Sequence, residues 1–375
     1  MLKGIHLTLM IGPAIPVPAP RVVVDALTSI QVTSGEARSG FQLTFSLGKK
    51  SPLLTTMLPA GYFDPMITRV IIMVTVRGLP NVIMDGLVTQ QELSPSNEPG
   101  ESTLTVTGED LSIVMGVVEM PFMRYPAMPD NVQVMAIVAK YLAFGIVPIA
   151  IPPVFMNVPL PIDEIPVQYG TDLDYIRKLA HANGYVFYVE PGPAPGTSIA
   201  YWGPDIRIPN PQPALNVNMD AHTNVESLSF SLDGLKKKLL MVNILDPVTK
   251  KMTVPVPIPD ISILKPPLGA RPALPSKVEF PGGMAKMGMI KTMAGVLGML
   301  MSSNDSITGS GTLDVLRYGR ALKSRQLVGV RGAGVAYDGL YYVNSVTHTL
   351  KRGEYKQSFN ISRDGLISLT PRVVV

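Results

Sequence analysis

Proline is the feature that most constrains the fold, because 36 of the 375 residues are prolines and they are spread along most of the chain. A proline inside a helix removes one backbone hydrogen bond, and its ring clashes with the preceding turn. This proline content therefore argues against long helices, coiled coils and helical solenoids. The chain is nevertheless 46% hydrophobic, and its net charge is only +4. This combination argues against disorder and predicts several folded domains built mainly from strands.

Residues 1–107 predict a first β domain. Apolar and polar residues alternate at 26–33 and 41–47, which indicates half-buried strands, and a β-branched run at 70–76 indicates a buried strand. Several short strands at this spacing are typical of a small β-barrel or a β-sandwich. Further strands are expected at 5–11, 82–89 and 102–107.

The pattern changes at residue 108, and residues 108–216 predict an α/β region. A helix over 131–144 is its clearest element. Asp130 is the expected N-cap of this helix, and Gly145 is the expected residue at its C-terminal end. The three- and four-residue spacing predicts a buried apolar stripe formed by Val132, Met135, Val138, Ala139 and Leu142.

Two more helices are expected in this region. A short one opens after Gly108 and ends at Met115. Another is expected over 172–183, with Thr171 as its N-cap and Asp174 in the capping-box position. The buried face of the helix over 172–183 is expected to hold Leu173, Ile176, Leu179 and Ala180. Two strands follow, at 185–189 and 198–202.

Residues 217–250 and 310–366 predict a second β domain. Strands at 225–232 and 238–245 are expected to form a hairpin through Asp233-Gly234. A helix is expected at 312–325, with one apolar side formed by Leu313, Leu316 and Leu322. The domain is predicted to end in a meander of strands at 327–335, 340–350 and 355–362.

The residues between these two parts are interpreted as an insertion at 251–309, rich in Pro, Met and Gly, and residues 367–375 as a C-terminal tail. Nine prolines at 247–281 indicate an extended segment. The Met-rich stretch 282–304 has two open interpretations. It is an adaptable contact surface, because Met side chains mould to partners, or it is a flexible insertion.

No catalytic constellation is visible in the sequence. The chain has no Cys, which excludes disulfides, thiol catalysis and Cys-based metal sites. Four histidines are dispersed without metal-ligand spacing, at His6, His181, His222 and His348. Acidic pairs that could flank a sugar bond, but that also stabilise helix starts, are Glu109-Asp110, Asp163-Glu164 and Asp172/Asp174. We therefore expect no enzyme activity and no catalytic, cofactor-binding or metal-binding residues.

Three other binding signals are weak. The glycines of 329–334 lie in a strand context with no helix after them, so they predict a turn and not a phosphate loop. Lys236-Lys237-Lys238 is too short for a nucleic-acid module. The uncharged stretch 142–162 is long enough to span a bilayer, but it holds five prolines and predicts an extended segment, not a transmembrane helix.

Two stretches carry a family resemblance. The first is VQYGTDLDYIRKLAHANGYVFYVEPGPAPGTSIAY at 167–201, and the second is YDGLYYVNSVTHTLKRGEYKQSFNISRDGL at 337–366. Both resemble the phage late control D family, the baseplate hub proteins of contractile tails and contractile injection systems. Supporting stretches are LTVTGEDLSIVM, YPAMPDNVQVMAIVAKYLAFGIVP and GIHLTLMIGPAIPVPAP, at 104–115, 125–148 and 4–20.

This resemblance implies a mainly β fold in which two small tube-type β-barrel domains flank an α/β region. Three copies would form a ring with pseudo-sixfold symmetry that joins a hexameric inner tail tube to a trimeric spike. The implied partners are two further copies of the same chain in a homotrimer, the spike protein, the inner tube protein and other baseplate proteins. No nucleic acid is expected among the partners. The particle would be assembled in the bacterial cytoplasm. A phage, an extracellular particle and a cell-anchored system all stay open.

Two other functions are weighed against this one. A cell-wall-degrading enzyme would need a pair of carboxylates across a cleft, and Glu109 and Asp172 are the residues to test. A carbohydrate-binding β module would need an exposed aromatic platform, for which Trp202 is the single tryptophan available. No hexapeptide or octapeptide repeat is visible, so the spike is expected on another chain.

Overall fold

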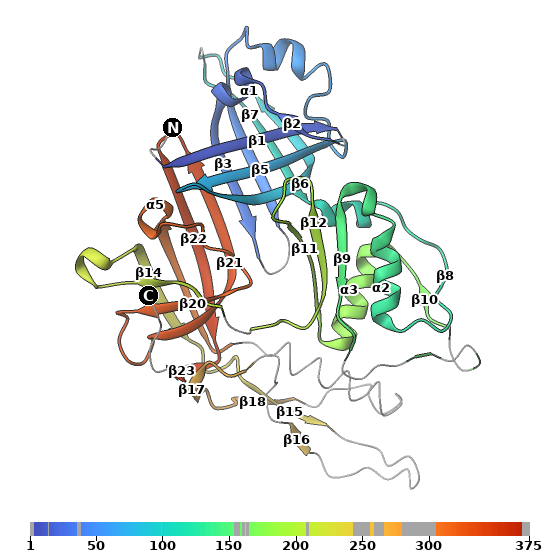
Figure 1. Cartoon of the computed structure of the whole chain (residues 1–375), viewed down its shortest axis with the longest axis vertical. Coiled ribbons are helices and arrows are strands. Elements are labelled where there is room, and N and C mark those ends of the chain that lie inside the picture. The colour runs from blue at the N-terminus through green and yellow to red at the C-terminus, as the bar shows by residue number, and fades with distance from the viewer. Residues whose placement is uncertain are drawn as a thin grey trace.

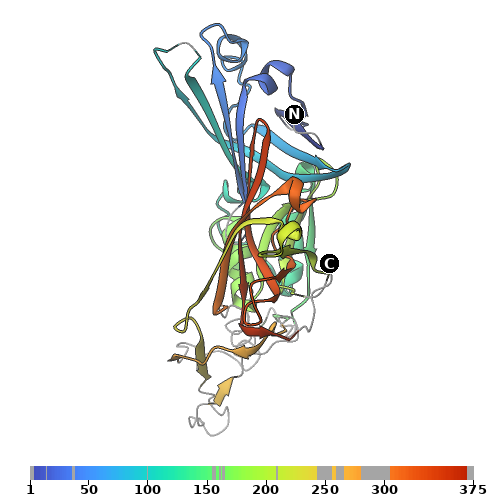
Figure 2. The same ribbon diagram turned by 90° about the vertical axis from the view of Figure 1, so that its left-hand side faces the viewer.

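The computed structural model describes residues 4–13, 15–35, 39–98, 100–153, 158–159, 162, 165–207, 210–242, 256–258, 266–279 and 305–369. Two β units and an α/β layer make up most of the described chain (Figure 1). The first β unit is drawn in blue at one end of the long axis, and a side view shows it inclined against the rest of the molecule (Figure 2). The protein is therefore mainly β, as the sequence predicts.

The first β unit comprises the elements between residues 5 and 110. They are β1 (Ile5–Pro13), β2 (Val17–Pro18), α1 (Arg21–Ala26), β3 (Leu27–Ser34), β4 (Gly40–Leu47), a π-helical turn (Leu53–Met57), β5 (Thr68–Val76), β6 (Leu79–Ser94) and β7 (Ser102–Asp110). All the strands predicted for this part of the chain are confirmed. Along β7, buried residues alternate with half-buried ones, and the first five residues of β5 are all buried, as its β-branched run indicates.

The second β unit comes from two separate parts of the chain. Its elements are β13 (Gln212–Asn216), a 3-10 turn (Asp220–His222), β14 (Val225–Leu232), β19 (Ile307–Asp314), α5 (Val315–Tyr318), β20 (Leu327–Arg331), β21 (Gly339–Lys351) and β22 (Glu354–Arg363). The predicted meander is confirmed, with turns at Asp338-Gly339 and Arg352-Gly353.

The two β units are hydrogen-bonded into one sheet. Among the described residues this sheet has 13 strands, in the order β14-β19-β22-β21-β3-β4-β7-β6-β5-β1-β2, and β20 and β13 extend it from β21. The join is the antiparallel pair β3–β21, in which Ile30 lies opposite Leu350. One hydrophobic core runs beneath both units. The division of the chain into separate domains at 107 and 216 stays a prediction.

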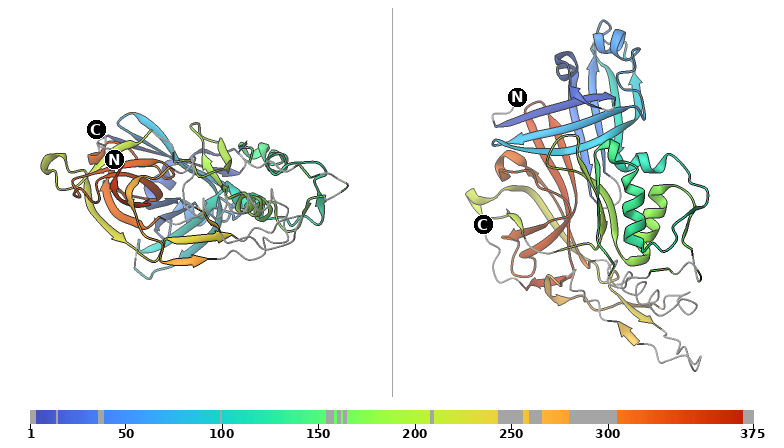
Figure 3. Two further views of the ribbon diagram at one scale, coloured as in Figure 1. Left: turned by 90° about the horizontal axis from the view of Figure 1, so that it is seen from below. Right: turned by 45° about the vertical axis from the view of Figure 1, so that its right-hand side comes forward.

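The α/β layer lies beside the large sheet. Its elements are a 3-10 turn (Leu111–Gly116), β8 (Met123–Arg124), α2 (Asp130–Ala139), a 3-10 turn (Leu142–Phe144), β9 (Ile146–Ala150), β10 (Val167–Gln168), α3 (Asp172–Asn183), β11 (Val186–Pro191) and β12 (Ser198–Gly203). The three-stranded sheet β11-β12-β9 separates the helices from the large sheet (Figure 3, right). The layer has a core of its own around Trp202 and Ile176.

Helix α3 begins and ends where the sequence predicts. The Thr171 hydroxyl accepts a hydrogen bond from the Asp174 amide and donates one to the Asp174 carboxylate. Gly184 adopts the left-handed conformation that ends the helix. The predicted apolar face is also confirmed, since Ile176 and Ala180 are buried and Leu173 is packed against them.

The prediction for α2 is wrong in its length, its cap and its buried face. The α-helix ends at Ala139, a separate 3-10 turn covers Leu142–Phe144, and Pro129 is the N-cap instead of Asp130. Of the predicted stripe only Val138 is buried, and Val132, Met135 and Leu142 are exposed. The buried face instead holds Asn131, Gln133, Val134, Ile137 and Val138. The helix is apolar on most sides, so spacing alone does not define which side faces the core.

Three further predictions fail for long-range reasons. Strand β14 pairs with β19, so it forms no hairpin with β15 (Lys238–Val242), which lies in a small sheet with β16 (Val256–Ile258) and β18 (Lys277–Glu279). The predicted helix at 312–325 is the end of β19 followed by one turn of helix, because pairing with β22 extends the strand to Asp314. The helix predicted from Gly108 begins only at Leu111, because β7 continues to Asp110.

Two further strands, β17 (Gly269–Pro272) and β23 (Gly365–Ser368), form a small antiparallel sheet. The stretch 282–304 lies outside the described residues, as does most of the predicted insertion. None of the helices in the described ranges combines the length and the apolar character that crossing a membrane requires. The uncharged stretch at 142–162 forms a 3-10 turn and β9 where it is described.

Candidate interaction surfaces

The histidines form no common site. His6, His181 and His222 are exposed on separate elements, and His348 is buried between β3 and β22. The His348 ring nitrogen Nδ1 lies 2.7 Å from the Tyr355 hydroxyl, and burial lowers the pKa of His348 to about 4. The ring is therefore neutral at pH 7 and acts as a core side chain. In the described ranges no three His, Asp or Glu residues are grouped closely enough to hold a metal ion.

The candidate carboxylates have structural partners. Asp110 caps the 3-10 turn through the Ser112 amide and also accepts a hydrogen bond from the Ser39 amide. Asp172 is completely buried and is held by Gln168, the Tyr141 hydroxyl and the Lys140 ammonium group, at 2.6 to 2.8 Å.

The acidic pairs therefore do not assemble into an open acid–base pair. Asp174 is bonded to its own helix cap, and Glu109 faces Gly40 within the sheet. Asp163 and Glu164 lie outside the described residues. Asp110, Asp172 and Asp174 stabilise local turns or a buried network, and neither of the two described pairs lies across a cleft.

A buried ion pair fixes the first β unit to the α/β layer. Arg69 on β5 donates two hydrogen bonds of 2.7 Å to Asp85 on β6, in a bidentate arrangement. The same guanidinium donates to the Gly196 carbonyl at 3.2 Å, and the Ser198 hydroxyl donates to Asp85 at 3.3 Å. The Arg69 side chain is 6% exposed and that of Asp85 is fully buried. The β unit and the layer are thus joined by charge-assisted contacts shielded from water.

A second buried network joins the layer to the second β unit. Arg207 donates to Asp305 at 2.7 Å and to Asp205 at 3.3 Å, and its guanidinium lies 4.4 Å from the centre of the Tyr342 ring. The Tyr342 hydroxyl donates to Asp205, and Ser362 donates to Asp305. Although burial opposes it, the two carboxylates raise the pKa of Arg207. Residues 205–207 and Asp305 are therefore held to the neighbouring strands β21 and β22.

A cation–π contact also links the layer to the second β unit. The Arg325 guanidinium lies 4.0 Å from the centre of the Tyr188 ring on β11, and the Arg325 amide donates to the Val343 carbonyl on β21. Tyr188 is itself stacked on Tyr201, with ring centres 5.1 Å apart. Both β units thus contact the same layer through buried or aromatic interactions.

The layer exposes several large apolar side chains. Phe122 and Tyr169 are exposed by 67% and 62% and contact each other edge to face, with ring centres 5.3 Å apart. Other exposed apolar residues of the layer are Val117, Val118, Met123, Val132, Met135, Leu142, Val147 and Ile149. The exposed Phe122–Tyr169 pair is a candidate contact for another protein.

Comparison with known proteins finds no matching family model and no matching curated protein. Solved structures do match. A tail protein from Neisseria meningitidis has 15% identity and a TM-score of 0.61, with 97% of this chain and 98% of that chain covered. A 43 kDa tail protein of prophage MuSo2 from Shewanella oneidensis has 12% identity and a TM-score of 0.61, with 96% and 100% covered.

A third match extends the likeness beyond phages. An E. coli component of the type VI secretion system, described as structurally similar to tail proteins gp27 and gp5 of bacteriophage T4, has 10% identity and a TM-score of 0.52. The alignment covers 93% of this chain and 78% of that one. At such low identity these matches define the fold. The chain therefore has the fold of phage tail proteins and of a type VI secretion component.

Sequence reasoning missed the residues that hold the parts together. Arg69, Asp85, Arg207 and Asp305 are ordinary charged residues in the sequence, and their partners lie 16 or 98 residues away. The one available signal was a charged residue within an apolar β-branched run, as with Arg69 beside 70–76. A charge at such a position is rarely buried without a partner.

Proposed function

We propose that the chain is the structural hub of a baseplate in a phage tail or a contractile injection system. In this proposal three copies form a ring that joins a hexameric inner tube to a trimeric spike, as in the late control D proteins that the sequence resembles. The hub has no enzyme activity of its own. The observation that carries the proposal is a fold shared with phage tail proteins over 97% of this chain.

The architecture supports a ring with mixed symmetry. Each chain holds two β units joined side by side at β3–β21, so three chains would present six units. A surface with six similar units can meet a sixfold tube, whereas the α/β layer occurs once per chain and suits threefold contacts. The exposed apolar side chains of the layer support a role in a larger assembly.

The two other functions have no specific observation in their favour. Trp202 is fully buried, so it cannot serve as an aromatic platform for a sugar. Asp110 and Asp172 are held by neighbouring backbone and side-chain groups. Both alternatives are accordingly set aside in favour of a structural role.

The experiment that tests the proposal is a measurement of native mass, for the purified chain alone and mixed with tube and spike proteins from the same particle. Class averages of any ring would follow. We expect a threefold ring with a central channel, closed on one face by the spike. A chain that remains a monomer with every partner offered would refute the hub function.

A further inference from the structure

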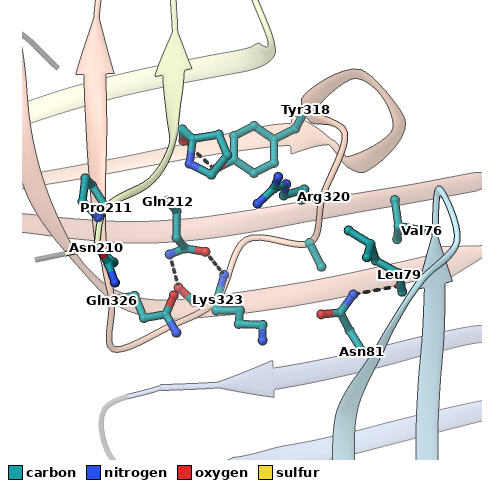
Figure 4. Close-up of a pocket in the computed structure, with 12 residues that line it drawn as sticks. Val76, Leu79, Asn81, Asn210, Pro211, Gln212, Tyr318, Arg320, Lys323 and Gln326 are labelled. Carbon is teal, nitrogen blue, oxygen red and sulfur yellow. Dashed lines mark hydrogen bonds between the residues drawn. The ribbon is translucent and has the colours of Figure 1, made fainter. Parts of the chain in front are cut away.

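A pocket lies where the first β unit meets the second (Figure 4). It has a volume of about 340 Å³ and opens between the β5–β6 turn, the residues that precede β13 and the loop between α5 and β20. Its lining joins three stretches of chain that lie more than 100 residues apart in sequence: 76–81, 210–213 and 318–326. The third stretch also holds Arg325, which contacts Tyr188 of the layer.

The pocket is positively charged. Arg320 and Lys323 line it, and there is no acidic residue among its 12 lining residues. Neither cation forms an ion pair within the described part of the chain. Lys323 also acts on Glu190 of the layer, where burial raises the pKa of the carboxyl and the charges of Arg325 and Lys323 oppose that rise. Both ammonium and guanidinium groups therefore remain available to a ligand at the rim.

The loop that carries these two cations is irregular but firmly held. The fully buried side chain of Gln357 accepts from the Leu322 amide and donates to the Leu322 carbonyl, both at 2.9 Å. Gln212 makes the same two hydrogen bonds with the Lys323 backbone, at 2.8 Å. The Tyr318 hydroxyl donates to the Pro213 carbonyl at 2.6 Å. Because this loop is held at Tyr318, Leu322 and Lys323, little conformational entropy is lost in ordering it when a ligand binds.

The rest of the lining matches an extended peptide. Val76, Leu79 and Ala321 supply apolar contact area, and Asn210 and Gln326 present exposed amide groups that can both donate and accept hydrogen bonds. In a peptide with a carboxylate next to an aliphatic or proline residue, the carboxylate would pair with the cations and the neighbouring side chain would contact the apolar wall. A volume of this size lies at the lower end of the range for ligand sites, enough for a few side chains.

We propose that this pocket binds an acidic, extended segment of a partner protein, with one carboxylate on Arg320 and another on Lys323. The choice of occupant rests on charge complementarity and on the apolar wall, which a sugar–phosphate backbone would not use. The inference deepens the proposed hub function, and it rests on that function only for the kind of protein that carries the segment.

The test uses the full chain and a panel of fluorescent hexapeptides. Each peptide holds two Glu residues separated by one to three Leu or Pro residues, and each has a twin in which Gln replaces Glu. Binding is measured by fluorescence anisotropy at low salt for the natural chain, for Arg320→Glu/Lys323→Glu, and for the control Arg124→Glu/Lys178→Glu, which reverses two exposed cations on the layer. A single-stranded oligonucleotide is the competing probe.

We expect at least one acidic peptide to bind about tenfold more tightly than its Gln twin, because two exposed ion pairs contribute that much. The pocket variant should lose this preference, and the control should keep it. If no peptide is preferred over its twin, or if the pocket variant binds as well as the natural chain, the proposal is refuted. Tighter, pocket-dependent binding of the oligonucleotide would also refute it, in favour of a nucleic-acid partner.

Two further measurements distinguish loss of peptide binding from loss of folding, and the pocket proposal from the hub proposal. Arg320→Ala/Lys323→Ala serves as a milder variant, and the unfolding midpoint followed by Trp202 fluorescence reports whether each variant is folded. A ring that forms with tube and spike while the peptides fail would leave the hub function standing without this pocket. Acidic peptides that bind to a chain which never forms a ring would support the pocket and refute the hub.

Discussion

The bidentate pair Arg69–Asp85 should control the stability of both the first β unit and the neighbouring layer. Asp85→Ala would leave the buried Arg69 guanidinium with only the Gly196 carbonyl and would remove the partner of the Ser198 hydroxyl. Breaking a buried pair from one side costs about 3–5 kcal/mol. Two lost charge-assisted hydrogen bonds at about 1.5–3 kcal/mol each give a similar value. We expect Asp85→Ala to lower the free energy of unfolding by about 4 kcal/mol.

The assay is urea denaturation followed by fluorescence of Trp202, the single tryptophan, which is fully buried in the core of the layer. A mutation on β6 is thus read from a side chain in a different part of the fold. A double-mutant cycle is completed by Arg69→Ala and by the double variant Arg69→Ala/Asp85→Ala. The double variant should cost less than the sum of the two single variants by about 2 kcal/mol, because it leaves no unpaired buried charge.

Ser198→Ala measures the weaker 3.3 Å contact alone and should cost about 1 kcal/mol. The matched control is Lys356→Ala, which removes an exposed ion pair with Glu226 on the second β unit and should change stability by less than about 0.5 kcal/mol. Strict additivity of Arg69→Ala and Asp85→Ala, or a cost below about 1 kcal/mol for Asp85→Ala, would refute the idea that the two charges stabilise each other. A Ser198→Ala variant as stable as the natural chain would refute a contribution of this contact to the join with the layer.

Three further predictions follow from single sites. Because the folded pKa of His348 is lowered to about 4, only the unfolded chain takes up this proton between about pH 6.5 and 4. The free energy of unfolding should therefore fall by up to about 3 kcal/mol as the pH drops through this window. His348→Gln should remove this contribution to the pH dependence, measured by urea titrations at several pH values. An unchanged pH dependence in that variant would contradict the role given to His348. Gly332→Ala should lower the free energy of unfolding by about 3 kcal/mol in the same assay, because φ of Gly332 is +88° and an added Cβ would lie 1.9 Å from the Val217 carbonyl oxygen. Gly334 has a similar φ of +92° but open space around it, so Gly334→Ala should cost only about 1 kcal/mol. Equal costs for the two variants would refute the clash at Gly332. Phe122→Ser should leave the Trp202 midpoint unchanged but weaken assembly with partner proteins, measured by native mass, and a full-strength complex would exclude this surface from the interface.

The sequence predicts local structure well wherever local signals agree. Helix α3 has a capping Thr171, an acidic first turn, an apolar face and a terminal Gly184, and every one of these signals is realised. Helix α2 has the same kind of spacing but too many apolar residues for one face to be distinguished. Its buried face is defined by a partner, because the Tyr175 hydroxyl donates to Gln133 and turns that side inward.

Long-range pairing could not be predicted from spacing. Strands β3 and β21 are each marked by alternation, yet nothing in either strand indicates that Ile30 lies opposite Leu350. The same limit applies to the pocket, because the loop backbone at Leu322 and Lys323 is held by Gln357 and Gln212, which lie far from it in sequence. Glutamine side chains that replace backbone pairing in this way leave no sequence pattern.

The position of the junctions has a consequence for how a hub of this kind would respond to force. The layer contacts the first β unit through Arg69–Asp85 and the second through Arg207 and Arg325, whereas the two β units share the β3–β21 ladder and one core. A load applied to the layer by a spike would therefore reach both units, and would pass between them through strand hydrogen bonds acting together. Weakening either ionic junction alone should leave the β3–β21 ladder in place and loosen the contact between the layer and that β unit. If the repeated β units meet the sixfold tube and the single layer of each chain meets the threefold spike, Asp85→Ala should impair spike attachment before it impairs ring formation.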